Sequence, residues 1–143
     1  QKLLNWSNHV RSWTKEKNLE LFLLKYEDLH LSPLNVLREI LAFSGLPASD
    51  SDIVKAIEKR SFANVSREED QSGFGEKPEK MKKFFRKGSP SSWQEELTPA
   101  QAEIVVRNHW QVMAEFGYLT PEVLQFCGIN REDLENQKVT EVY

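Results

Sequence analysis

The sequence has 143 residues and a single cysteine, and its 19 Lys and Arg against 22 Asp and Glu give a formal charge of −3. The length suits one domain with one core, and no apolar run approaches the ~18 residues that cross a membrane. One cysteine cannot form an internal disulfide, and the mild acidity argues against a nucleic-acid binder. We therefore expect a cytoplasmic protein with no nucleic-acid partner.

Residues 3–17 form the first predicted helix, because their apolar side chains recur at spacings of three and four. The chain starts at Gln1 without a Met, and residue 3 already lies inside this pattern, so we expect part of a longer chain. The apolar run 21–24 is too short for a buried helix and predicts a parallel-type strand over 19–26. A lone strand needs a partner along its edges, so we expect a homo-oligomer, strand exchange or a missing N-terminal segment to cover it.

The middle of the sequence carries clear helix boundaries. Ser32 followed by Pro33 predicts a helix start, and Gly45 predicts its end in a left-handed turn. A short helix is predicted over 51–58, and the polar run 66–78 with its two glycines predicts a loop. Residues 77–88, which we call the basic segment, hold six Lys and Arg against one Glu, a local charge of +5.

The last third of the sequence is predicted to be helical with a polar end. A capping box, with proline at the first helical position, predicts a helix over 98–117. A second, shorter helix is predicted over 120–127. We therefore divide the chain into a folded segment, 1–127, and a polar tail, 128–143.

Catalytic and metal-binding patterns are not found in the sequence. The histidines His9, His30 and His109 lie at no zinc-ligand spacing, so no metal site is predicted. His109 lies on the apolar face of its predicted helix and is interpreted as a satisfied core histidine. Cys127 lies among apolar residues and is interpreted as a buried structural thiol.

Three pieces of the sequence have the chemistry of an anion or nucleotide site. Arg86-Lys87-Gly88 combines a planar fork for phosphate oxygens, a compact charge and a glycine that lets backbone N–H groups approach. Ser61-Phe62 offers a hydroxyl for a phosphate and a ring for stacking. Tyr26, at the C-terminal edge of the predicted strand, lies where open α/β sheets bind ligands. Taken singly, each has an ordinary explanation: a solvated turn, a helix N-cap followed by a core Phe, and an aromatic plug.

The order of these pieces resembles a known family. The run Trp6-x-x-His9-Val10-x-x-Trp13, residues 22–29, Ser61-Phe62, residues 84–88 and Trp93 together look like the C-terminal part of a sulfotransferase, over roughly residues 3–116. The resemblance implies transfer of a sulfuryl group from 3′-phosphoadenosine 5′-phosphosulfate (PAPS) to a hydroxyl or amine of a small-molecule or glycan acceptor. As fold it implies the C-terminal part of a P-loop-type three-layer α/β sandwich, mostly helical here, with one clear parallel-type strand.

The resemblance also implies residue roles. Arg86-Lys87-Gly88 match the triplet that grips the 3′-phosphate of the nucleotide. Tyr26 matches a tyrosine that reaches the adenine, and Phe62 matches a ring that stacks on it, with Ser61 alongside. The family's phosphosulfate loop and catalytic base have no counterpart here, so we assign no catalytic residue and expect no turnover by this chain alone.

The residues alone are compatible with two other functions. The chain could be a non-catalytic nucleotide- or partner-binding helical module that kept only the 3′-phosphate half of the site. It could also be a helical interaction domain whose basic segment binds an acidic partner. Such binding would be salt-sensitive and would show no preference for adenine nucleotides.

Overall fold

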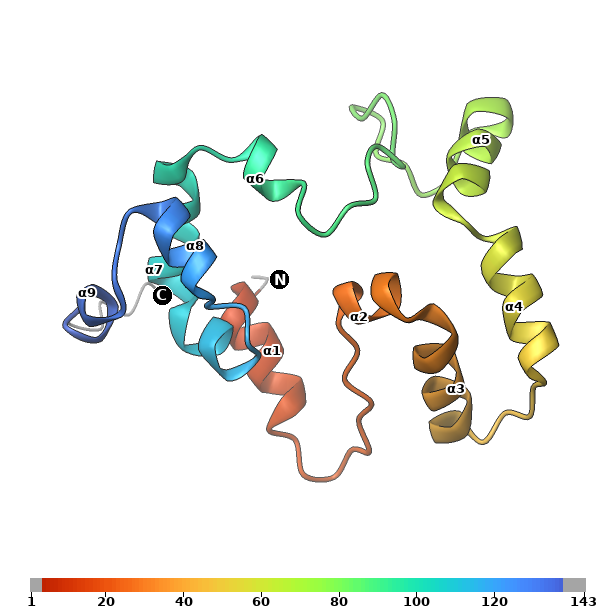
Figure 1. Cartoon of the computed structure of the whole chain (residues 1–143), viewed down its shortest axis with the longest axis horizontal. Coiled ribbons are helices and arrows are strands. Elements are labelled where there is room, and N and C mark those ends of the chain that lie inside the picture. Colours follow the sequence, from red (N-terminus) through yellow and green to blue (C-terminus); the bar gives the residue numbers. More distant parts are fainter. Residues whose placement is uncertain (1–3, 138–143) are drawn as a thin grey trace. The chain divides into compact units, whose positions relative to one another are not determined.

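The computed structural model describes residues 4–137, and this part of the chain contains α-helices and loops but no β-strand (Figure 1). The chain divides into two compact units, each of which is described by itself. Unit 1 comprises residues 1–20 and 93–143, and unit 2 comprises residues 21–92.

Unit 1 is built around a small apolar core. Its described helices are α1 (Trp6–Thr14), α6 (Trp93–Glu96), α7 (Pro99–Glu115), α8 (Pro121–Cys127) and α9 (Arg131–Glu135). Ala102 and Val106 of α7 pack with Cys127 of α8 and Leu134 of α9, and the Trp93 ring packs against them. The interpretation of Cys127 as a buried thiol is confirmed, and burial raises the pKa of that thiol.

The helices α7 and α8 begin as the sequence predicts. Thr98 Oγ1 accepts a hydrogen bond from the Gln101 N–H at 3.3 Å, and Gln101 Oε1 accepts one from the Thr98 N–H at 2.9 Å. This reciprocal pair satisfies two backbone donors that a helix start otherwise leaves unpaired. The predicted helix over 120–127 is also confirmed. Within the segment described as a polar tail, α9 docks on the core through the fully buried Leu134.

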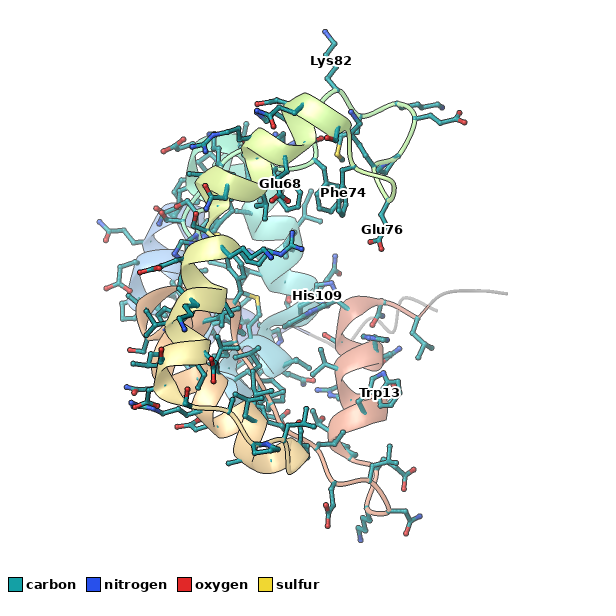
Figure 2. The ribbon with its side chains drawn as sticks, turned by 90° about the vertical axis from the view of Figure 1, so that its right-hand side faces the viewer. Trp13, Glu68, Phe74, Glu76, Lys82 and His109 are labelled. Carbon is teal, nitrogen blue, oxygen red and sulfur yellow. The ribbon has the colours of Figure 1, made fainter. Side chains whose placement is uncertain are left out.

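In unit 1, α1 packs against α7 through polar as well as aromatic contacts. Ser7 is buried, and its Oγ lies 2.8 Å from Nδ1 of His109. The Trp6 and His109 rings meet edge-on with their centroids 5.6 Å apart, and Figure 2 shows His109 on α7. Burial lowers the pKa of His109, which favours the neutral ring. His109 is half-buried and has a hydrogen-bond partner in Ser7, so the interpretation as a satisfied histidine is confirmed, although the residue lies at the edge of the core.

Unit 2 contains four helices and the basic segment. The helices are α2 (Tyr26–Leu31), α3 (Pro33–Ser44), α4 (Asp50–Lys59) and α5 (Phe62–Ser72). The predicted boundaries of α3 are confirmed, because Pro33 occupies its first turn and Gly45 closes it with a φ of 66° in the left-handed region. The helix predicted over 51–58 is confirmed as α4. Val36 and Ile53 are the buried hydrophobic residues among the described residues of this unit.

The predicted strand over 19–26, and with it the α/β fold class, is wrong for the described residues. Residues 20–25 form an irregular segment, and Tyr26 opens α2 instead of ending a strand. A strand is stabilised by hydrogen bonds to a neighbouring strand, and residues 4–137 contain none that could provide them. The leucines of the apolar run are 40–58% exposed. Since the strand is absent from the described residues, its bare edge no longer predicts an oligomer, and the oligomeric state itself stays a prediction.

The predicted loop over 66–78 is also wrong in its first half, because α5 continues to Ser72. Ser61 is the N-cap of this helix, as the ordinary explanation of Ser61-Phe62 requires. The charged run 67–70 is therefore helical. Within it Glu69 is buried, whereas its neighbours on both sides are exposed.

Candidate functional site

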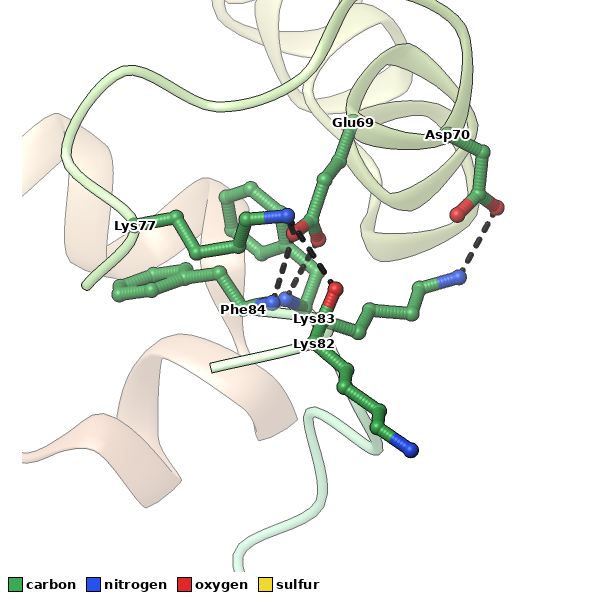
Figure 3. A network of polar contacts seen from close by, with 7 residues as sticks. Glu69, Asp70, Lys77, Lys82, Lys83 and Phe84 are labelled. Atoms are coloured by element: carbon green, nitrogen blue, oxygen red, sulfur yellow. Dashed lines mark hydrogen bonds and ion pairs between the residues drawn. The ribbon is translucent and has the colours of Figure 1, made fainter. Parts of the chain in front are cut away.

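The basic segment folds back onto the C-terminal half of α5 (Figure 3). Glu69 is buried there, and its two carboxylate oxygens accept hydrogen bonds from the backbone N–H groups of Phe84 at 2.7 Å and Phe85 at 2.9 Å. The Lys77 ammonium lies 3.8 Å from the same carboxylate. A buried carboxylate is costly without such partners, so these contacts explain why an acidic residue can occupy this position.

The pKa of Glu69 follows from the same contacts. Burial by itself raises the pKa of this carboxyl, but the backbone hydrogen bonds from Phe84 and Phe85 and the charges of Lys77 and Lys83 outweigh it. The pKa of Glu69 therefore lies below its usual range, and the carboxylate is ionised at neutral pH.

Acidic residues of α5 neutralise part of the charge of the basic segment. Lys83 Nζ lies 2.9 Å from an oxygen of Asp70, and Lys77 pairs with Glu69. Lys82 extends away from the helix (Figure 2), while its backbone carbonyl accepts a hydrogen bond from Lys77 Nζ at 3.2 Å. Two of the six cations thus hold the segment on α5, and they contribute less free charge than the sequence suggests.

Gly88, at the end of the basic segment, contacts the first residue of α5. Its φ of 58° lies in the left-handed region, and an added Cβ would lie 2.3–2.9 Å from ring carbons of Phe62. The Phe62 ring also meets the Phe85 ring edge-on, with centroids 6.4 Å apart. Both the backbone conformation and the lack of space therefore require glycine at position 88.

His30 connects Gly88 to Tyr26. Its Nε2 lies 2.5 Å from the Gly88 carbonyl oxygen, and because a carbonyl can only accept, Nε2 carries the hydrogen. The Tyr26 and His30 rings meet edge-on at 5.3 Å, and Tyr26 is 50% exposed. Gly88 therefore contacts Phe62 directly and is linked to Tyr26 through His30. Three of the predicted site residues are therefore connected within unit 2, although they are far apart in the sequence.

The other predicted site residues lie on the same two segments. Arg86 and Lys87 are exposed, and the Arg86 N–H donates a hydrogen bond to the Phe84 carbonyl at 3.1 Å. Ser61 is half-buried, and its hydroxyl makes no capping hydrogen bond to α5. Two cations and a hydroxyl can bind an anion, and the exposed aromatic surface can hold a flat apolar group.

Two residues of this arrangement were missed by the sequence reasoning. The sequence pattern predicts no role for His30 and places Glu69 in a polar loop. A helical interpretation of 62–72 would have placed Phe62 and Glu69 on one face, because they are seven residues apart. The contact of His30 with Gly88 joins residues 58 positions apart and has no local signal.

A family model described as the sulfotransferase domain matches residues 3–117. The chain belongs to the sulfotransferase family. Sulfotransferase 2A6 of Rattus norvegicus is 26% identical to it over 117 residues, which cover 78% of this chain and 41% of that protein. Sulfotransferase 1E1 of Bos taurus is 30% identical over 105 residues, and sulfotransferase 1C2 of Homo sapiens is 25% identical over 104 residues, each covering 69% of this chain and 35% of the relative.

The chain thus spans 35–41% of the length of these sulfotransferases. No solved structure matches it significantly. Membership of the family confirms the resemblance. None of the described helices is long and apolar enough to cross a membrane. The described residues contain no group of three or more His, Cys, Asp or Glu side chains that could hold a metal ion.

Proposed function

We propose that this chain forms the nucleotide-binding part of a sulfotransferase that uses PAPS as donor. In this proposal Arg86 and Lys87 bind the 3′-phosphate with charge-assisted hydrogen bonds, and Gly88 lets the backbone approach it. Tyr26 and Phe62 contact the adenine, and Ser61 lies along the nucleotide. The protein would transfer the sulfuryl group to a hydroxyl or amine of a small-molecule or glycan acceptor.

The observation that carries the proposal is the contact between Gly88 and Phe62. It joins the cationic triplet to the segment that begins α5, and the left-handed glycine leaves no space for a side chain between them. The hydrogen bond from His30 to the Gly88 carbonyl adds Tyr26 to the same place. A cationic triplet beside two aromatic residues suits a phosphate attached to a flat heterocycle better than it suits an acidic protein surface.

Calorimetric titration with 3′-phosphoadenosine 5′-phosphate tests the proposal on this chain. We expect the double variant Arg86→Ala/Lys87→Ala to bind at least about tenfold more weakly than the wild type, because charge-assisted hydrogen bonds are worth about 1.5–3 kcal/mol each. Adenosine 5′-monophosphate lacks the 3′-phosphate, so its affinity should change little in the same variant.

A matched control comes from the same segment. Lys80→Ala/Lys82→Ala removes two cations of the basic segment that lie outside the triplet, and it should leave nucleotide affinity close to that of the wild type. Equal heats for the wild type and Arg86→Ala/Lys87→Ala would contradict the proposal. If both double variants lost affinity equally, and if binding were abolished by salt and showed no preference for adenine, an acidic binding partner would be favoured instead.

A further inference from the structure

The contacts of Glu69 reach the backbone immediately before the proposed phosphate-binding cations. The peptide group between Phe84 and Phe85 is held at both ends. Its N–H donates to Glu69 at 2.9 Å, and its carbonyl accepts from the Arg86 N–H at 3.1 Å. One peptide group therefore connects the buried carboxylate to Arg86.

A single face of α5 holds the chain on both sides of the cationic pair. Phe62 and Glu69 are seven residues, or about two helical turns, apart, which separates them by ~10 Å along the helix axis. Glu69 binds the backbone of Phe84 and Phe85 before the pair, and Phe62 contacts Gly88 after it. Residues 86 and 87 lie between these two fixed points, so their backbone positions are set by α5.

We propose that Glu69 is a positioning residue for the nucleotide: by holding the Phe84 and Phe85 amides, its carboxylate presents Arg86 and Lys87 to the 3′-phosphate. This inference rests on the proposed function of the triplet. Glu69 does not itself touch the nucleotide, because its two oxygens are directed at backbone N–H groups. A segment that is fixed before binding loses less conformational entropy when the ligand arrives.

The substitution Glu69→Gln tests this role at constant side-chain size. Glutamine offers one oxygen, and its NH₂ group would face an N–H donor, so at least one of the two backbone bonds is lost. We expect the Kd for 3′-phosphoadenosine 5′-phosphate to rise about tenfold, which is the effect of losing roughly one hydrogen bond to a charged group. The Kd for adenosine 5′-monophosphate should stay unchanged.

Glu68→Gln is the matched control, because it removes the same charge one position away. The Glu68 side chain is 55% exposed and pairs with Arg60 at 3.0 Å, so its substitution should leave the affinity unchanged. Wild-type affinity in Glu69→Gln, or an equal loss in Glu68→Gln, overturns the positioning role. If Arg86→Ala/Lys87→Ala binds as the wild type does, the proposed function itself fails, and that result does not involve position 69.

Glu69→Asp separates positioning from charge balance. Aspartate keeps the negative charge beside Lys77 and Lys83, but its side chain is one CH₂ shorter and cannot reach the same two N–H groups. We expect Glu69→Asp to bind 3′-phosphoadenosine 5′-phosphate more weakly than the wild type does, as Glu69→Gln does. Full recovery in Glu69→Asp would mean that charge alone matters, which contradicts the proposal.

An acid titration of the wild-type chain by NMR gives a readout that needs no substitution at position 69. The amide protons of Phe84 and Phe85 should shift together as Glu69 is protonated, below the usual range of glutamate. Lys77, Lys83 and Asp70 also face this region, and Asp70 is the second carboxylate there, paired with Lys83. The same titration in Asp70→Asn should therefore keep the joint shift. Amide protons that do not titrate together would overturn the proposal.

Discussion

In unit 1 the side chains of Val106, Val112 and Leu134 are at most 2% exposed, and apolar packing joins three helices. In unit 2 the segment that carries Arg86 and Lys87 is held by other means: a buried carboxylate, a histidine hydrogen bond and ring contacts. Apolar burial is non-directional and depends mainly on how much surface leaves water. Hydrogen bonds to named backbone atoms fix the position of those atoms.

This difference shows which part of the molecule tolerates substitutions and which part requires particular residues. The core of unit 1 can exchange one apolar side chain for another of similar volume at small cost. The candidate site of unit 2 depends on single residues that have no equivalent, since only glycine suits position 88 and only a carboxylate suits position 69. Substitutions in unit 1 should therefore change stability, whereas substitutions around the triplet should change binding first.

The largest effect is expected for Leu134→Ala in unit 1. Leu134 is fully buried in the core, so its truncation should lower the free energy of unfolding of unit 1 by about 2–5 kcal/mol through lost burial and the cavity left behind. Ile104→Ala is the control within the same unit, because Ile104 is 62% exposed and its truncation should cost about 0.5 kcal/mol or less. Chemical denaturation measures both, and equal midpoints would remove the apolar core from the comparison.

The second effect is expected for Gly88→Ala in unit 2. The left-handed φ costs an alanine roughly 1–2 kcal/mol. Its Cβ would also lie within 2.9 Å of the Cγ atom at the base of the Phe62 ring, so the ring or the backbone must move. We expect weaker binding of 3′-phosphoadenosine 5′-phosphate as well as lower stability, measured by calorimetry and denaturation.

Gly45→Ala separates the two causes. Gly45 has nearly the same φ, 66°, but an added Cβ would have no neighbour within 4 Å. Both variants share the backbone cost, so the additional loss in Gly88→Ala reports the contact with Phe62. Equal losses of stability in the two variants, with nucleotide affinity intact in both, would show that this contact does not position the triplet.

The sequence predicts the helices whose boundaries have local signals. It fails for segments whose structure depends on contacts with residues far away in the chain. Pro33 and Gly45 predict the start and the end of α3, and the capping box predicts the start of α7. The apolar run 21–24 carries no such signal, because a strand exists only beside another strand. Residue pattern alone therefore could not distinguish a buried strand from an exposed apolar segment.

For the candidate site, the residues that would bind the phosphate can be recognised in the sequence, but the contacts that hold them in place cannot. Arg86, Lys87 and Gly88 are notable in sequence because of their chemistry. Glu69 lies in a run of charged residues, and nothing nearby indicates that it is buried. Its burial depends on the return of Phe84 and Phe85, which follow 15 and 16 residues later. The same holds for His30, whose role depends on a carbonyl 58 residues away.

The smallest effect concerns the polar contact within unit 1 and depends on pH. Burial lowers the pKa of His109 in the folded chain, so below about pH 6.5 the unfolded chain binds the proton first. The stability of unit 1 should therefore be constant above that pH and fall as the pH decreases toward the lowered pKa. His109→Gln should remove this slope between pH 7 and 5, as measured by denaturation at several pH values. A slope that persists in His109→Gln would assign the acid sensitivity to other groups. The contact between Ser7 and His109 would then add little to the stability of unit 1, which would rest essentially on apolar packing.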